Sequence, residues 1–168
     1  KIGVSPVLIV HLRKSSYKPP HTRKNAPPFE YKNIIFAHNG TIRDYSKLLK
    51  EMKPQDRPSS EALDSEVYAR FVISRLAPKV RESFKKAASY IRKNNNYSSL
   101  TCLFSNGKSL CAWREYTKTA GYYTLYSARA GGSSIISSEP VLQRLKWDLL
   151  PEKKLFCLNA AAPVAFLF

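Results

Sequence analysis

Hydrophobic and polar residues follow two different periods along this chain, and the change of period separates helix-forming from strand-forming segments. Residues 4–13 are a continuous apolar run rich in β-branched residues, and residues 33–38 are a second one. Runs of this kind predict buried strands. The intervening residues 14–30 are basic, rich in proline and without a period, so we expect a long irregular loop there.

A helical period dominates the middle of the chain. Apolar residues recur three and four positions apart through residues 59–77, which predicts a helix with one wide apolar face. The residues that build this face are Leu63, Val67, Tyr68, Phe71, Val72 and Leu76. The same period predicts a helix over residues 79–94, and a shorter helix is expected over residues 43–52.

From residue 97 onward the period is two, which is typical of strands with one buried face. Asn106-Gly107 divides residues 97–116 into two strands, and Gly131-Gly132 divides residues 121–140 in the same way. Both pairs predict tight hairpin turns, because their residues tolerate positive φ. Residues 154–168 predict one or two closing strands. Since helices and strands are segregated along the chain, we expect an α+β fold with helices layered on antiparallel sheets.

Length and composition limit the possible classes of protein. With 168 residues, of which 43% are hydrophobic, the chain predicts a single domain over residues 1–168. Lys and Arg outnumber Asp and Glu by 28 to 12, and the formal charge of +16 would attract nucleic acid, anionic surfaces or acidic substrates. No apolar run approaches the ~20 residues that span a bilayer, so we expect a soluble protein without a membrane partner.

The cysteines suggest the compartment. Cys102, Cys111 and Cys157 make an odd count, have no CxxC spacing and lie in apolar, strand-like segments. This pattern favours buried, inert thiols in a reducing cytoplasm. We expect neither a metal nor another cofactor.

Three short polar segments follow predicted strands or open a predicted helix: residues 11–13, 37–40 and 63–66. Taken singly, each has a common structural interpretation. A charged strand end is usually solvated, Asn-Gly is usually a turn, and Asp-Ser-Glu usually caps a helix.

Together, and in this order, these segments resemble the glutaminase domain of class II glutamine amidotransferases, in the stand-alone branch of these N-terminal nucleophile (Ntn) hydrolases. The matching motifs are His11-Leu12-Arg13, Pro28-Phe29, Phe-Ala-His-Asn-Gly-Thr-Ile over residues 36–42, Asp64-Ser65-Glu66, and Ser138-Glu139-Pro140 with Trp147. The resemblance implies a four-layer αββα sandwich of antiparallel sheets.

The resemblance also implies roles for individual residues. The Asn39 side-chain amide and the Gly40 backbone N–H would form an oxyanion hole, for which a neutral amide and a close-approaching glycine are suited. Arg13 would bind the α-carboxylate of glutamine with its planar guanidinium, and Asp64 would bind the α-ammonium group. His38 would support the turn beside the substrate rather than transfer protons.

The chain departs from the family at the nucleophile. Family members use a Cys at the mature N-terminus, whereas this sequence begins with Lys1 and has no Cys before Cys102. We therefore expect that the N-terminal strands of the fold are missing here. The nucleophile would come from a preceding segment of the gene product or from a partner subunit.

The leading hypothesis is an amide hydrolase that releases ammonia from glutamine, or cleaves a γ-glutamyl amide, through a Cys thioester. An inactive family member that acts as a binding or regulatory subunit is the alternative. A basic nucleic-acid-binding module is a weaker one, because the cations of residues 79–94 spread over the face that the apolar stripe leaves to solvent. The basic segment 14–32 would be the better nucleic-acid patch.

Overall fold

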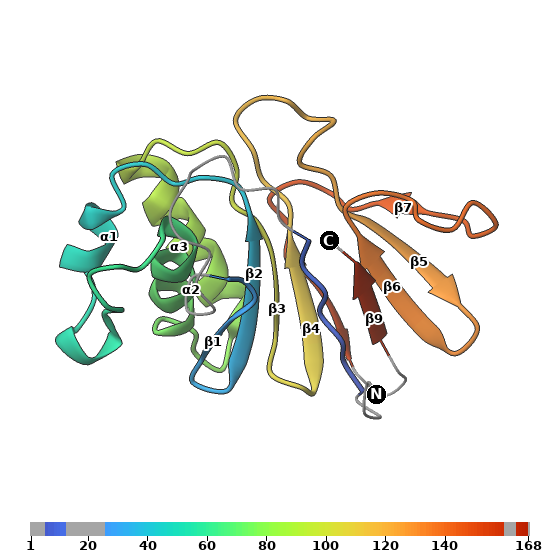
Figure 1. The fold of residues 1–168 in the computed structure, drawn as a ribbon, viewed down its shortest axis with the longest axis horizontal. Coiled ribbons are helices and arrows are strands. Elements are labelled where there is room, and N and C mark those ends of the chain that lie inside the picture. Colours follow the sequence, from blue (N-terminus) through green and yellow to red (C-terminus); the bar gives the residue numbers. More distant parts are fainter. Residues whose placement is uncertain (1–5, 13–25, 160–163, 168) are drawn as a thin grey trace.

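Two β-sheets stacked face to face form the centre of the protein, and helices cover the outer face of one of them (Figure 1). The computed structural model describes residues 6–12, 26–159 and 164–167. Its helices are α1 (Ser46–Lys50), α2 (Asp64–Ile73) and α3 (Val80–Asn94), with a 3-10 turn, η2 (Pro54–Asp56), between the first two. Within the described residues, no helix is long and apolar enough to cross a bilayer.

The first sheet has five strands in the order β1-β2-β3-β4-β8, and every neighbouring pair is antiparallel. Its strands are β1 (Phe29–Tyr31), β2 (Ile34–Asn39), β3 (Thr101–Ser105), β4 (Ser109–Trp113) and β8 (Phe156–Asn159). The hairpin predicted at Asn106-Gly107 joins β3 to β4 and is confirmed. Gly107 has a φ of 81°, a backbone conformation that favours glycine.

The second sheet has four strands in the order β7-β5-β6-β9. They are β5 (Tyr126–Ala130), β6 (Ser133–Ser137), β7 (Asp148–Leu149) and β9 (Val164–Leu167). The turn predicted at Gly131-Gly132 joins β5 to β6 and is also confirmed, with a φ of 59° at Gly131. β9 pairs with β6 in parallel, so the closing strand departs from the antiparallel pattern.

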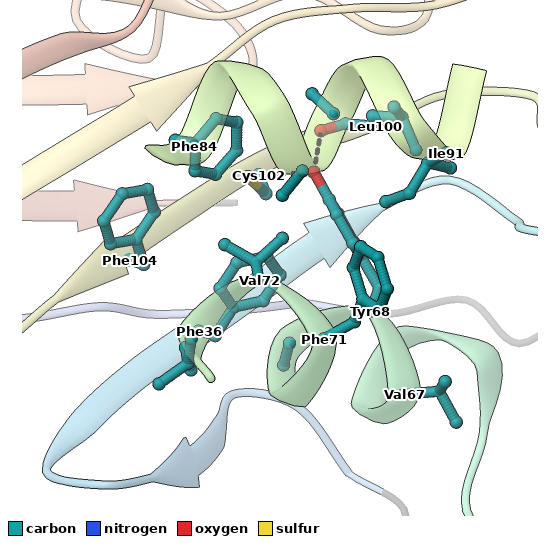
Figure 2. Close-up of a cluster of buried hydrophobic side chains, with 14 of the residues drawn as sticks. Phe36, Val67, Tyr68, Phe71, Val72, Phe84, Ile91, Leu100, Cys102 and Phe104 are labelled. Atoms are coloured by element: carbon teal, nitrogen blue, oxygen red, sulfur yellow. Dashed lines mark hydrogen bonds between the residues drawn. The ribbon is translucent and has the colours of Figure 1, made fainter. Parts of the chain in front are cut away.

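A core rich in aromatic rings fills the space between the helices and the first sheet (Figure 2). Phe84 of α3 stacks on Phe104 of β3 with ring centroids 5.4 Å apart, and it lies 5.0 Å from the ring of Trp113. The buried Tyr68 of α2 donates a hydrogen bond to the Leu100 carbonyl at 3.1 Å. Burial of these rings explains why α2 and α3 turn their apolar faces to this sheet.

Glu115, two residues after β4, is a fully buried carboxylate in the same layer. It accepts hydrogen bonds from Arg92 at 2.7 and 3.1 Å, from Tyr97 at 2.9 Å and from the Trp113 indole at 2.9 Å. Burial, followed by the negative charge of Glu115, raises the pKa of Tyr97 to about 12. These bonds offset the cost of burying the charge and link α3 to the sheet.

The core between the two sheets is smaller and aliphatic. Its buried members are Leu103, Leu110, Ala112, Leu125, Ile136 and Leu150. Val7 and Ile9 of the N-terminal segment pack against it. Figure 1 shows this segment, in blue, running between the sheets.

The strand predicted over residues 4–13 is wrong where the structure describes it. Residues 6–12 form no continuous strand, and Val7 makes only an isolated bridge. The apolar run is explained by the packing of the partly buried Val7 and Ile9 against the core between the sheets, which needs no regular ladder. An apolar run indicates contact with a hydrophobic core, and it does not by itself show that the segment pairs with another strand.

The helix predictions hold in part. α3 matches the predicted residues 79–94 within one residue, whereas α1 and α2 are shorter than the helices predicted over 43–52 and 59–77. β1 was not predicted: it pairs with β2 across Lys32-Asn33, whose φ values of 47° and 58° form a tight turn without glycine. The described helices all belong to the layer on the first sheet, and the second helical layer of the expected αββα sandwich is not among the described residues.

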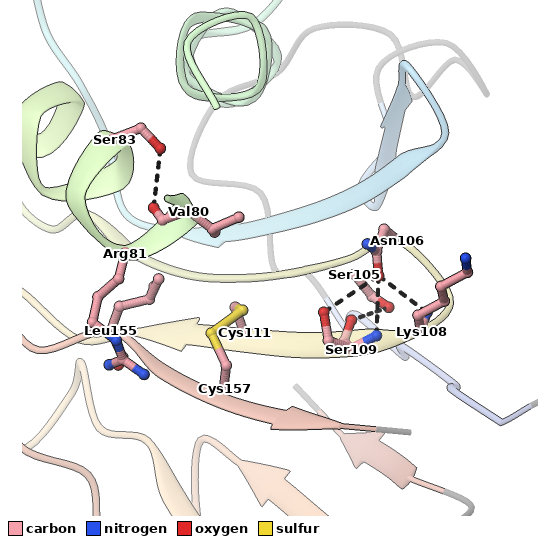
Figure 3. Close-up of a disulfide and its surroundings, with 10 residues drawn as sticks. All are labelled: Val80, Arg81, Ser83, Ser105, Asn106, Lys108, Ser109, Cys111, Leu155 and Cys157. Carbon is pink, nitrogen blue, oxygen red and sulfur yellow. Dashed lines mark hydrogen bonds between the residues drawn. A yellow bond between two sulfur atoms is a disulfide. The ribbon is translucent and has the colours of Figure 1, made fainter. Parts of the chain in front are cut away.

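Cys111 and Cys157 form a disulfide between β4 and β8 (Figure 3). They are directly opposite each other in the strand register, although 46 residues separate them in the sequence. The expectation that all three cysteines are thiols is therefore wrong for Cys111 and Cys157. The sequence could not predict the disulfide, because no local pattern indicates that these two strands are neighbours. Cys102 is a free, buried thiol as expected.

Candidate active site

Four of the five residues predicted for the site line one cavity at the end of β2. His38 and Asn39 close the strand, Gly40 follows it, and Asp64 opens α2 beside them. The cavity has a volume of about 1090 Å³. The fifth residue, Arg13, lies outside the described residues, so its predicted contact with a carboxylate stays a prediction.

Gly40 sits at a close approach between two backbone segments. A Cβ atom on Gly40 would lie 2.3 Å from the carbonyl oxygen of Ser99 and 2.7 Å from Nε2 of His38. Contacts this short do not occur for real Cβ atoms, so any other residue would displace the chain. Glycine is therefore required here by space, and its φ of 157° is also a backbone conformation that residues with a side chain rarely adopt.

Two hydrogen-bond donors at this turn are available to a ligand. Neither the Asn39 carboxamide nor the Gly40 N–H is hydrogen-bonded to another residue in the described part of the chain. The next amide along, that of Thr41, is engaged by Ser98 Oγ at 2.9 Å. A side-chain amide and an adjacent main-chain N–H on one cavity wall are a donor pair that can stabilise a developing oxyanion.

Asp64 is the first residue of α2, but its carboxylate does not cap that helix. Instead, Oδ2 accepts a hydrogen bond from the Ile42 N–H at 2.7 Å, which connects the helix start to the turn after β2. The second carboxylate oxygen has no hydrogen-bond partner among the described residues, and it can accept from a ligand cation in the cavity that Asp64 lines. The capping role that Asp-Ser-Glu motifs often have is not the one seen here.

His38 is buried and contacts two separate segments of the chain. Its Nδ1 lies 2.9 Å from Ser65 Oγ, and its Nε2 lies 3.0 Å from the Ser99 carbonyl oxygen. Burial lowers the pKa of His38 below its ordinary value, and the charge of Asp64 opposes this only partly. Burial therefore favours the neutral ring, and its two contacts join the end of β2 to α2 and to the segment before β3.

Sequence reasoning missed several residues of the cavity. Tyr122 and Tyr123 line it from the loop after β4, and Glu139 lines it from the segment after β6. Thr124 Oγ1 donates to the Ser138 carbonyl at 2.5 Å and joins these two segments. Ser138-Glu139 belonged to a matching motif but had no role assigned, and the tyrosines carried no signal at all.

None of the three cysteines offers a reactive thiol to this cavity. Cys111 and Cys157 are joined to each other. Cys102 lies opposite His38 in the β2–β3 register, but it is fully buried, and burial raises the pKa of its thiol far above the usual value. Among the described residues, no group of three His, Cys, Asp or Glu side chains could hold a metal ion.

Comparison with known protein families gives one match that covers most of the chain. The family model of glutamine amidotransferases class-II matches residues 4–126. An uncharacterized protein of Methanocaldococcus jannaschii, MJ1515, is 32% identical over 120 residues, and the match covers 67% of this chain and 32% of that protein. The chain thus spans about a third of the length of this curated relative.

Solved structures share the fold at low sequence identity. A glutamine aminotransferase class-II domain protein from Silicibacter pomeroyi has a TM-score of 0.59 at 19% identity, over 79% of this chain and 70% of that chain. Glutamine phosphoribosylpyrophosphate amidotransferase from B. subtilis has a TM-score of 0.51 at 16% identity, over 72% of this chain and 25% of that chain. The stacked sheets described above are therefore an Ntn-type arrangement.

Proposed function

The chain belongs to the class II glutamine amidotransferases, and from this premise we propose that it is an amide hydrolase that releases ammonia from glutamine, or cleaves another γ-glutamyl amide, through a Cys thioester. The observation that carries the proposal is the pair of unengaged donors, the Asn39 carboxamide and the Gly40 N–H, on the wall of a cavity that also holds the Asp64 carboxylate.

The proposed reaction makes direct use of this donor pair. A thiolate adds to the side-chain carbonyl carbon of the substrate, and the carbonyl oxygen becomes a tetrahedral oxyanion. Asn39 and Gly40 donate hydrogen bonds to that oxygen as its charge develops. The oxyanion collapses and breaks the C–N bond, and the leaving nitrogen takes up the proton that the thiol gave up and departs as ammonia. Water then hydrolyses the thioester to glutamate and regenerates the thiol. Donors held in place before the reaction lower the barrier because they need no reorganisation.

The amino-acid end of the substrate would be held by opposite charges. The free oxygen of Asp64 would accept from the α-ammonium group, while its other oxygen stays on the Ile42 N–H. Arg13 would bind the α-carboxylate in a bidentate manner. Holding both groups fixes the amide carbonyl relative to the oxyanion hole, which is an orientation effect.

The nucleophile in this proposal is a Cys outside residues 1–168, carried by another segment of the gene product or by a partner subunit. Two of the cysteines within the chain are in a disulfide, and the third is buried with a raised pKa. Thiolates are the reactive form, and a buried apolar site disfavours them. A cytoplasmic location also belongs to the proposal, but the Cys111–Cys157 disulfide removes the thiol pattern that suggested it.

The test is to incubate the complete gene product with glutamine and with γ-glutamyl amides, and to measure glutamate and the released amine. The proposal predicts turnover that is abolished by thiol alkylation and by Cys→Ala substitution of the nucleophile. An absence of turnover on every one of these substrates would contradict it. Saturable glutamine binding without turnover would favour the alternative, an inactive binding or regulatory subunit.

A further inference from the structure

The ring of His38 connects three elements at the candidate oxyanion hole. It belongs to β2, its Nδ1 contacts Ser65 in the first turn of α2, and its Nε2 contacts the main chain at Ser99 just before β3. The ring also packs edge-on against Tyr68, with centroids 5.0 Å apart. Together these contacts fix the orientation of the His38 ring.

The two contacts determine where the protons lie. A carbonyl oxygen can only accept, so the bond to Ser99 requires a proton on Nε2 of His38. A neutral imidazole carries one N–H, and Nδ1 is therefore an acceptor. The Ser65 hydroxyl must donate to it across the 2.9 Å separation. The Ser99 carbonyl thus requires the Nε2–H tautomer of His38, and the Ser65 hydroxyl stabilises that tautomer by donating to Nδ1.

Gly40 lies against the hydrogen bond between His38 Nε2–H and the Ser99 carbonyl. A side chain at Gly40 would point at both partners of that bond, since its Cβ would lie 2.3 Å from the Ser99 oxygen and 2.7 Å from His38 Nε2. If His38 took the other tautomer, a lone pair would face the lone pairs of the carbonyl. The two groups would separate, and the backbone of Gly40 would move with them.

A second bond connects the same two elements. The Asp64 carboxylate accepts from the Ile42 N–H at 2.7 Å, two residues beyond Gly40. Consecutive residues of α2, Asp64 and Ser65, therefore contact the chain on either side of the Asn39-Gly40 pair. The geometry of that pair depends on α2 as well as on β2.

We infer that Ser65 is a positioning residue for the oxyanion hole: through the Nε2–H tautomer of His38 and the Ser99 carbonyl, its hydroxyl fixes the direction of the Gly40 N–H. The inference rests on the proposed function for its catalytic consequence, while the tautomer and the position of Gly40 can be measured without it.

The experiment compares three variants of the complete gene product. Ser65→Ala removes the hydroxyl, and Ser65→Thr keeps it. Ser83→Ala is the matched control, because Ser83 is also a bonded hydroxyl near the start of a helix, α3, but it contacts Ala77 and Lys79 rather than the cavity. Nitrogen-15 spectra report the tautomer of His38, the amide cross-peak of Gly40 reports its position, and steady-state kinetics with glutamine give kcat and KM.

We expect the wild type and Ser65→Thr to hold the Nε2–H tautomer at neutral pH. Ser65→Ala should mix tautomers, shift the Gly40 cross-peak and lower kcat by roughly tenfold to a hundredfold, with KM within about twofold. Ser83→Ala should change none of these. A wild-type Nδ1–H tautomer or imidazolium would overturn the inference, and so would a Ser65→Ala variant whose tautomer and Gly40 cross-peak match the wild type, whatever its kcat. If the wild type has no glutamine turnover, the proposed function fails, and the two spectroscopic readouts still decide the role of Ser65.

Discussion

The helix-covered core and the end of β2 use polar groups in opposite ways. In the core, the buried Glu115 accepts hydrogen bonds from Arg92, Tyr97 and Trp113. At the end of β2, by contrast, the Asn39 carboxamide and the Gly40 N–H have no hydrogen-bond partner among the described residues. The polar groups around Glu115 bond to one another, whereas the donors at the end of β2 are available to a ligand.

This difference indicates where stability and function reside. Satisfied buried groups and stacked rings stabilise the folded state, whereas available donors contribute nothing to folding and can act on a ligand. Substitutions in the core should therefore lower the free energy of unfolding. Substitutions at Asn39 should lower the reaction rate and leave the free energy of unfolding nearly unchanged.

Phe84→Ala should have the largest effect, because it removes a buried ring that stacks on Phe104 and touches Trp113. We expect a loss of about 3–5 kcal/mol in the free energy of unfolding, measured by urea denaturation. Lys85→Ala, at the exposed neighbouring position of α3, should change it by less than about 0.5 kcal/mol. Similar values for the two variants would show that this core is not the main source of stability.

Glu115→Gln should have the next largest effect. The substitution keeps the shape of the side chain but turns an amide NH₂ toward donors that now bond to a carboxylate. The expected loss is about 2–3 kcal/mol in the free energy of unfolding. Glu82→Gln is the control, since Glu82 is exposed and its ion pair with Lys79 spans 4.0 Å. An unchanged stability in Glu115→Gln would mean that the buried network is not coupled to folding.

His38 should make stability depend on pH, because burial lowers the pKa of its ring in the folded state. The unfolded chain binds a proton at this ring near pH ~6.5, and the folded chain does not, so the free energy of unfolding falls as the pH drops below that value. The limiting slope is about 1.4 kcal/mol per pH unit. Urea denaturation of the wild type and His38→Gln between pH 7 and pH 5 isolates the effect. A difference between them that does not vary with pH would contradict a neutral His38.

Local patterns were sufficient to predict the elements that carry their own signals. The apolar stripe of α3, the Asn106-Gly107 turn and the strand that leads into Gly40 are all in the expected places. Each is specified by residues that are close together in the sequence. Asp64 differs from these, because its placement with Asn39 followed from the family resemblance and not from a local pattern.

Features that depend on contacts between distant segments could not be predicted. The pairing of β4 with β8, and with it the Cys111–Cys157 disulfide, depends on a register between strands 46 residues apart. Residues 6–12 place the partly buried Val7 and Ile9 against the core between the sheets and make only an isolated bridge at Val7. An apolar run does not distinguish this arrangement from a strand. The bond from Ser65 to His38 likewise requires α2 to lie against β2.

The most direct test of the proposed oxyanion hole is the effect of Asn39→Ala on glutamine turnover and on stability, measured in the complete gene product. Asn94→Ala is the matched control, because its amide bonds to the Tyr90 carbonyl at the end of α3 and not to the cavity. We predict that Asn39→Ala lowers kcat/KM by about 100-fold or more, changes the free energy of unfolding by less than about 0.5 kcal/mol, and that Asn94→Ala keeps the wild-type rate. A rate within about threefold of the wild type in Asn39→Ala would contradict the oxyanion hole.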